Sequence, residues 1–201
     1  MEQNVIKKQV RRMSQEEAFR MNGKIPPQAI EIEESVLGAL LLDQNAITNA
    51  IDILRAEYFY VEENQFIYYA ITSLFREGNP VDLLSVAEQL KKDGKFDEVG
   101  GLNKLVSLTS RITSAAHIEY HVRILSEKYI QRELIRVSTE TLKDSYDETM
   151  DVLNLLDRTE TKFLEINDSN FKSDFHSMDT LLFNTLKEIE ANQNSADDSM
   201  G

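Results

Sequence analysis

The chain has 201 residues, 41% of them hydrophobic, no cysteine and a formal net charge of −13 at pH 7. The lack of cysteine excludes disulfides, thiolate nucleophiles and cysteine-ligated metal centres, and an acidic surface disfavours nucleic acid, which binds mainly through Lys and Arg. No run approaches the ~18 apolar residues of a membrane span, and residues 1–24 lack the apolar centre of a signal peptide. We therefore expect a soluble, cytoplasmic protein with a folded core.

Residues 1–24 form a polar tail that we expect to be mostly disordered. The tail contains six basic and three acidic residues, so its net charge is +3. Such a segment fits either a short solvated tail or a basic arm that contacts DNA or an acidic partner.

Residues 25–112 are predicted to form a small all-α head of five or six short helices. Apolar residues recur at helical spacing, and no stretch alternates as a strand does. The expected boundaries are Pro26-Pro27 opening the first helix, a second helix at Ala46–Leu54, Asn64 capping the third and Gly78 ending it, Asp82 capping the fourth and Gly94 ending it, and Gly100-Gly101 before the last.

Residues 113–166 are predicted to form a long antiparallel hairpin of two helices. The first, from Ser114 to about Asp144, contains no Pro or Gly and would be roughly 45 Å long. Its apolar residues follow three lines, and the second helix (Met150–Ile166) is apolar over about half its circumference, more than one neighbour hides.

These surplus faces predict self-association of the hairpin. The alternative is a long helix buried in one larger core. The candidate residues for contact with a second subunit or another protein are Ile124, Ile135, Leu142, Leu153, Leu156 and Phe163.

Residues 167–192 are predicted to form a polar linker followed by a separate amphipathic helix that starts after Ser177. An isolated helix of this length is marginal in water, so its apolar stripe needs a docking surface elsewhere. The stripe consists of Met178, Leu182, Leu186 and Ile189. Residues 193–201 are expected to be the disordered start of a connection to a further domain.

Several landmarks in this order resemble the N-terminal domain of the bacterial replicative DNA helicase, the DnaB family. The resemblance runs from about Ile25 to Glu190. Its segments are IPPQAIEIEESVLGALLLD (25–43), the pair Tyr58-Phe59, FREGNPVDLLSVAEQLKKDG (75–94), VGGLNKLVSL (99–108) and TSAAHIEYHVRILSEKYIQRELI (113–135).

The resemblance implies a helical head, a protruding hairpin and a linker helix that packs on the motor domain of a neighbouring subunit. In this family, heads and hairpins pair into dimers, and three dimers form a collar on the hexameric ring. The collar receives primase and influences loading, so a helicase loader is a further expected partner.

The family's motor is an ATPase with a G-x-x-x-x-G-K-[ST] loop, and the present sequence has no such segment. We therefore expect no catalytic residue and no cofactor in this chain. ATP and magnesium would belong to a motor domain outside it, as would contact with DNA. A Walker A motif within ~50 residues after Gly201 would distinguish a helicase fragment from the alternative, a stand-alone helical adaptor unrelated to replication.

Other candidate sites are weaker. His117 and His121 lie four residues apart, which suits one helical face, but no third metal ligand is obvious, and we expect surface or packing histidines and no metal site. A histidine phosphotransfer module needs its histidine midway along a bundle, whereas His117 comes in the first turn of the long helix. The carboxylates Glu31, Glu33 and Glu34 are interpreted as solvated helix faces.

Overall fold

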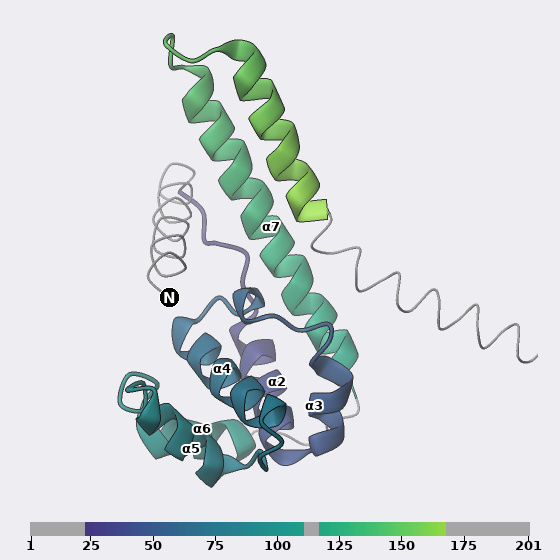
Figure 1. Cartoon of the computed structure of the whole chain (residues 1–201), viewed down its shortest axis with the longest axis vertical. Helices are drawn as coiled ribbons and strands as arrows, with labels where there is room; N and C mark the ends of the chain where they lie inside the picture. Colours follow the sequence, from purple (N-terminus) through teal and green to yellow (C-terminus); the bar gives the residue numbers. More distant parts are fainter. Residues whose placement is uncertain (1–22, 111–116, 168–201) are drawn as a thin grey trace, which may run out of the picture.

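The structure, a computed structural model, describes residues 23–110 and 117–167. Within these ranges every regular element is helical, which confirms the predicted all-α class. Figure 1 shows short helices gathered into a head and two long antiparallel helices that project from it. The expectations for residues 1–22, for the linker helix and for residues 193–201 fall outside the described residues.

Helix α2 (Ile30–Leu42) is the centre of the head. Its residues from Val36 to Leu41 are all buried, as expected of a helix with neighbours on every side. Those neighbours are α3 (Gln44–Ala50), α4 (Glu62–Arg76), α6 (Gly101–Ser110) and α7 (Ile118–Ser145). The short helix η1 (Ala56–Tyr58) and α5 (Leu83–Lys92) complete the head.

The hairpin consists of α7 and a helix over residues 152–167. The first turns of α7 belong to the head, because Ile118, Val122 and Leu125 are buried in its core. The rest of α7 extends away from the head, and the second helix runs back beside it. None of the helices in residues 23–110 and 117–167 is long and apolar enough to span a membrane.

Three predicted helix ends are confirmed. Gly78 and Gly94 have φ angles of +72° and +67°, a conformation that favours glycine. The following N–H groups of Asn79 and Lys95 donate back to carbonyls of α4 and α5. At the start of α5, Asp82 accepts hydrogen bonds from the backbone N–H groups of Leu84 and Ser85, as predicted for a capping residue.

Other predicted boundaries are wrong. Helix α2 begins at Ile30, and Pro26-Pro27 lie in an extended segment before it. Helix α3 ends at Ala50, four residues before the predicted Leu54. Helix α4 begins at Glu62, so Asn64 lies inside the helix and does not cap it.

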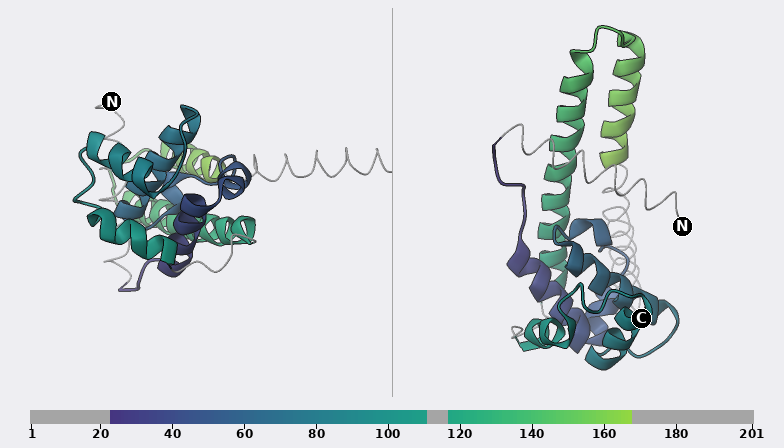
Figure 2. Two further views of the ribbon diagram at one scale, coloured as in Figure 1. Left: turned by 90° about the horizontal axis from the view of Figure 1, so that it is seen from below. Right: turned by 90° about the vertical axis from the view of Figure 1, so that its left-hand side faces the viewer.

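The extended segment over residues 23–29 runs beside α7 on the way to α2. Figure 2 shows the same neighbourhood from a second direction. The contact is specific, since a side chain of α7 donates to the carbonyl of Pro27. The start of the described chain therefore lies beside the hairpin.

The Asp82 cap can be tested by substitution. Asp82→Ala should lower the free energy of unfolding by about 1 kcal/mol, because two N–H groups at the start of α5 lose their acceptor. The hydrogen bond from the Ser85 backbone lowers the pKa of Asp82. The stabilisation is therefore present at neutral pH and lost as the pH falls through that lowered pKa. Urea unfolding followed by circular dichroism measures both effects.

The matched control is Asp93→Ala, which removes an aspartate from the other end of α5. The helix dipole disfavours a negative charge there, so no comparable loss is expected. Equal losses for the two variants would contradict the capping assignment.

Candidate interaction site: the hairpin and its junction with the head

The carboxylate of Glu33 is buried inside the head at the start of α4. Its side chain is only 1% exposed. Oε1 accepts a hydrogen bond from the Tyr60 backbone N–H at 2.6 Å, and Oε2 accepts from the N–H of Val61 at 3.2 Å and from Asn64 Nδ2 at 2.9 Å. No side chain of α4's own N-terminal segment caps that helix. Glu33 of α2 therefore binds the backbone that leads into α4 and a side chain in its first turn.

Arg132 of α7 holds the same loop from the opposite direction. It is 3% exposed. Its Nη1 donates to the carbonyl of Pro27 at 2.9 Å, and Nη2 donates to the carbonyls of Tyr58 at 2.9 Å and Glu57 at 3.2 Å. The guanidinium thus joins α7 to two head segments that are far apart in sequence.

Aromatic rings complete the junction. The ring centroids of Tyr58 and Tyr129 lie 5.2 Å apart. The guanidinium carbon of Arg132 lies 5.7 Å from the Tyr60 ring and 5.9 Å from the Tyr129 ring. These distances are within the range of cation–π attraction, which favours a buried guanidinium.

Burial and charge act in opposite directions on the two ionisable groups. Burial raises the pKa of Glu33, whereas the bonds from Asn64, Tyr60 and Val61 and the charge of Arg132 lower it. Burial lowers the pKa of Arg132, and the charge of Glu33 is the largest influence that raises it. An arginine stays protonated under such conditions, so the junction contains a buried cation.

A series of polar contacts leads from the junction along the hairpin. Arg136 pairs with the buried Glu133 at 3.0 Å and with Glu140 at 3.0 Å. Glu140 also pairs with Lys162 of the second helix at 2.8 Å. Further out, the hydroxyls of Thr141 and Thr159 lie 3.3 Å apart.

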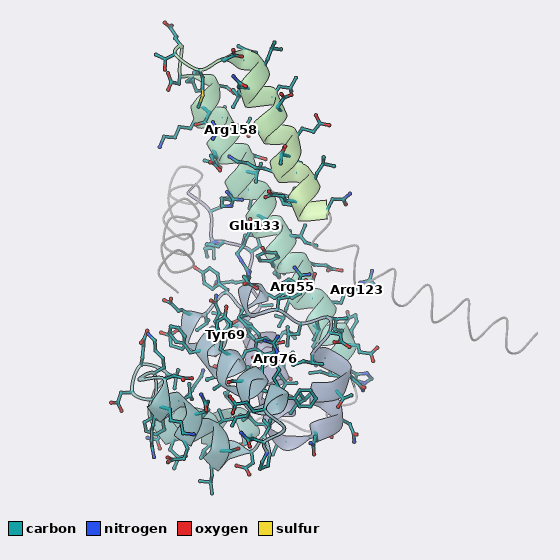
Figure 3. The ribbon with its side chains drawn as sticks, in the orientation of Figure 1. Arg55, Tyr69, Arg76, Arg123, Glu133 and Arg158 are labelled. Atoms are coloured by element: carbon teal, nitrogen blue, oxygen red, sulfur yellow. The ribbon has the colours of Figure 1, made fainter. Side chains whose placement is uncertain are left out.

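Arg158 and Asp144 approach to 3.9 Å at the far end of the hairpin. In Figure 3, Arg158 lies near this end and Glu133 lies closer to the head. The two helices of the hairpin therefore face each other with many polar groups. The buried apolar residues of the hairpin include Val137 on α7 and Ile166 on the second helix.

The apolar residues of the second helix remain largely uncovered. Leu153, Leu156 and Phe163, all predicted interface residues, are 73%, 62% and 38% exposed. At 100° per residue, Val152, Leu156 and Phe163 fall within about 40° of one another, to one side of the face that touches α7. Leu153 and Leu164 widen this strip. We call the five residues the second-helix stripe: Val152, Leu153, Leu156, Phe163 and Leu164.

The predicted line on α7 lies on another side of the hairpin. Ile124, Ile135 and Leu142 share one line of the helix, roughly opposite the residues that face the second helix. Leu142 is 51% exposed, while Ile124 and Ile135 are half-buried. None of the six predicted interface residues is fully buried. Their contact with a partner stays a prediction.

Two predicted sites remain, the histidine pair and the linker-helix stripe. His117 precedes α7 and is exposed, and His121 is half-buried. Within residues 23–110 and 117–167, no three His, Cys, Asp or Glu side chains form a group suited to a metal ion. The docking stripe of Met178, Leu182, Leu186 and Ile189 lies outside the described residues.

The sequence interpretation was wrong about Glu33 and assigned no role to Arg132. A signal for both was present in the helical spacing. Glu33 lies four residues before Leu37, and Arg132 lies seven residues after Leu125, so each charge falls on an apolar line of its helix. A charged residue on such a line indicates a buried pair or capping role.

Solved structures share this architecture. The N-terminal domain of DnaB helicase from Mycobacterium tuberculosis matches with a TM-score of 0.67 and 32% identity, covering 71% of this chain and 99% of that one. A structure of a DnaB-like replicative helicase and its interactions with primase matches with a TM-score of 0.59 and 23% identity, covering 70% of this chain and 31% of that one, which shows a shared fold. A helical head with this hairpin is thus the fold of a helicase N-terminal domain.

Sequence relatives agree with the fold. The chain is 40% identical over 169 residues to the replicative DNA helicase DnaB of Rhodothermus marinus, covering 84% of this chain and 18% of that protein. It is 36% identical over 181 residues to the replicative DNA helicase DnaC of Bacillus subtilis (strain 168), covering 90% of this chain and 40% of that protein. The model of the DnaB-like helicase N terminal domain matches residues 25–127. The chain belongs to this family, and it spans less than half the length of these two relatives.

The charge state of Glu33 can be tested with Glu33→Gln, which keeps one acceptor oxygen and removes the titration. At neutral pH the free energy of unfolding of the variant should be about 1–3 kcal/mol lower than that of the wild type, because one backbone N–H loses its acceptor. Urea unfolding at pH values from about 4.5 to 8 measures the difference between the two proteins.

The sign of the pH dependence follows from the raised pKa. Folded Glu33 keeps its proton at pH values where the unfolded chain, with a pKa near 4.5, has lost it. The stability contributed by this group therefore falls as the pH rises from about 4.5 through the folded pKa, and the wild type's advantage over the variant shrinks. A difference that is constant or grows with pH would contradict the raised pKa of this carboxyl.

Proposed function

We propose that this chain is the assembly and primase-recruitment module of a replicative DNA helicase. The observation that carries the proposal is a projecting hairpin with polar contacts inside and apolar residues outside, in a chain that belongs to the DnaB-like helicase N-terminal domain family. Apolar residues placed this way on a rigid element suit contact with other chains. Membership of this family does not favour the alternative of a stand-alone adaptor.

The parent protein would unwind duplex DNA at the replication fork in the cytoplasm, using ATP and magnesium bound by a motor domain outside this chain. The relatives matched here are replicative helicases more than twice as long as the matched region. Contact with DNA would occur through the same outside part. In the parent, the stripe of Met178, Leu182, Leu186 and Ile189 would dock on a neighbouring motor domain, and a helicase loader is a further expected partner.

Two separate apolar surfaces support a two-level assembly. A dimer uses one self-complementary surface, and joining three dimers into a closed ring requires a second surface on each chain. The second-helix stripe and the line of Ile124, Ile135 and Leu142 lie on different sides of the hairpin. A trimer of dimers is therefore compatible with the faces that each chain offers.

Self-association is tested by the double substitution Leu156→Asp and Phe163→Asp. Charges placed in a desolvated interface cost several kcal/mol, so the dissociation constant should rise at least ~100-fold. Sedimentation at concentrations up to ~100 µM, well above the constants of modest interfaces, measures it. Because both side chains are exposed in the single chain, its helicity should be unchanged.

The matched control is Asn154→Asp, which adds a charge at an exposed polar position on the same helix. It should leave the sedimentation profile unchanged. A wild-type chain that remains a monomer at every concentration would overturn the assembly role.

Primase recruitment is tested with primase from the same organism. The chain should bind full-length primase and should not bind primase that lacks its C-terminal helicase-binding domain. Surface plasmon resonance with the present chain immobilised measures the affinity for primase. No binding of intact primase at ~100 µM, the weak end of specific interaction, would contradict the recruitment role and leave the assembly role in place.

A further inference from the structure

The position of Arg132 on α7 separates two parts of the helix. Before it, Ile118, Val122 and Leu125 are buried in the core of the head. After it, Arg136 and Glu140 make their ion pairs within the hairpin. Arg132 thus joins the head to α7 where that helix leaves it.

We propose that Arg132 is the positioning residue that sets the angle between the head and the hairpin. The angle itself is a property of one chain and needs no partner. Its consequence for assembly rests on the function proposed above, because the apolar faces of the hairpin must meet those of other subunits at a defined orientation.

The geometry of the guanidinium carries the proposal. Its Nη1 and Nη2 atoms bind carbonyls of two head segments, at Pro27 on one side and at Glu57 and Tyr58 on the other. A planar group with fixed donor directions restrains rotation as well as distance, which an ammonium group does not. The rings of Tyr60 and Tyr129 lie close to the guanidinium and further limit its movement.

The head side of the joint is itself fixed. The loop that carries the carbonyls of Glu57 and Tyr58 continues directly into Tyr60 and Val61, whose N–H groups are bound by Glu33. Glu33 belongs to α2, the central helix of the head. The loop is therefore held from both sides, by α2 through a carboxylate and by α7 through a guanidinium.

A small rotation at this joint is magnified along the hairpin. Helix α7 continues for about 13 residues beyond Arg132, or roughly 20 Å at ~1.5 Å per residue. A change of about 10° at the joint would move the far end by roughly 3–4 Å over this length. Such a shift exceeds the tolerance of a packed interface, whose side chains interdigitate closely.

The test measures a distance within one chain. Because the protein has no cysteine, Lys92→Cys in the head and Ser145→Cys at the far end of α7 introduce a unique pair of exposed sites for nitroxide labels. Double electron–electron resonance then reports the distribution of distances between head and hairpin. Mixing in an excess of unlabelled protein ensures that the measured distances join two labels on the same chain.

Arg132→Lys keeps the positive charge and loses the planar fork. We expect its distance distribution to shift or broaden by about 3–4 Å, the displacement that a rotation of about 10° produces at the far end of α7. Its helicity should be unchanged. The control is Arg123→Lys on the same helix, where the arginine is exposed and pairs with Glu127 one turn further along. Its distribution should match that of the unsubstituted protein.

A folded Arg132→Lys protein with the distribution of the control overturns the proposal. If Arg132→Lys does not fold, the double variant Glu33→Gln with Arg132→Met replaces the two buried charges by neutral side chains of similar size. An unchanged distribution in that variant overturns the proposal equally. Sedimentation of the same samples tests the proposed assembly role separately from the role of Arg132. A chain that never self-associates contradicts the assembly role, whereas the distances between head and hairpin still test the role of Arg132.

Discussion

In the described part of the chain, the head meets the hairpin at one loop that is held between two buried side chains, Glu33 and Arg132. Residues around Tyr58 and Tyr60 present carbonyls to Arg132 on one side and N–H groups to Glu33 on the other. Each charge satisfies backbone groups that would otherwise be buried without partners, which is the condition under which buried charges are tolerated. This loop adds polar links to the direct packing of α2 against α7 in the core of the head.

The hairpin reverses the usual distribution of polar and apolar residues. Ion pairs and hydroxyl groups lie between its two helices, whereas Leu153 and Leu156 face outwards. An isolated pair of helices normally hides its apolar residues in the contact between them. Among the described residues, these apolar side chains are left on the outside of the hairpin, where a further protein surface could cover them, and this supports the assembly role proposed above.

Much of the fold was predictable because its signals are local. Asp82 and Gly78 act on the helix next to them, so their residue types alone indicate a helix start and a helix end. The exposed apolar residues of the second hairpin helix were also predictable, since they follow from helical spacing. The junction was not. Glu33 binds donors about 30 residues away, and Arg132 binds carbonyls more than 70 residues away, so only the folded chain brings them together.

The second helix of the hairpin has two faces with different responses to dissolved ions. Its pairs between Lys162 and Glu140 and between Arg158 and Asp144 are partly accessible to solvent, and salt weakens such pairs by screening. Its exposed stripe responds in the other direction, because strongly hydrated anions such as sulfate favour apolar burial. In the assembly proposed above, a salt such as ammonium sulfate would therefore weaken the ion pairs that hold this helix to α7 and strengthen the contact of its apolar stripe with a neighbouring chain.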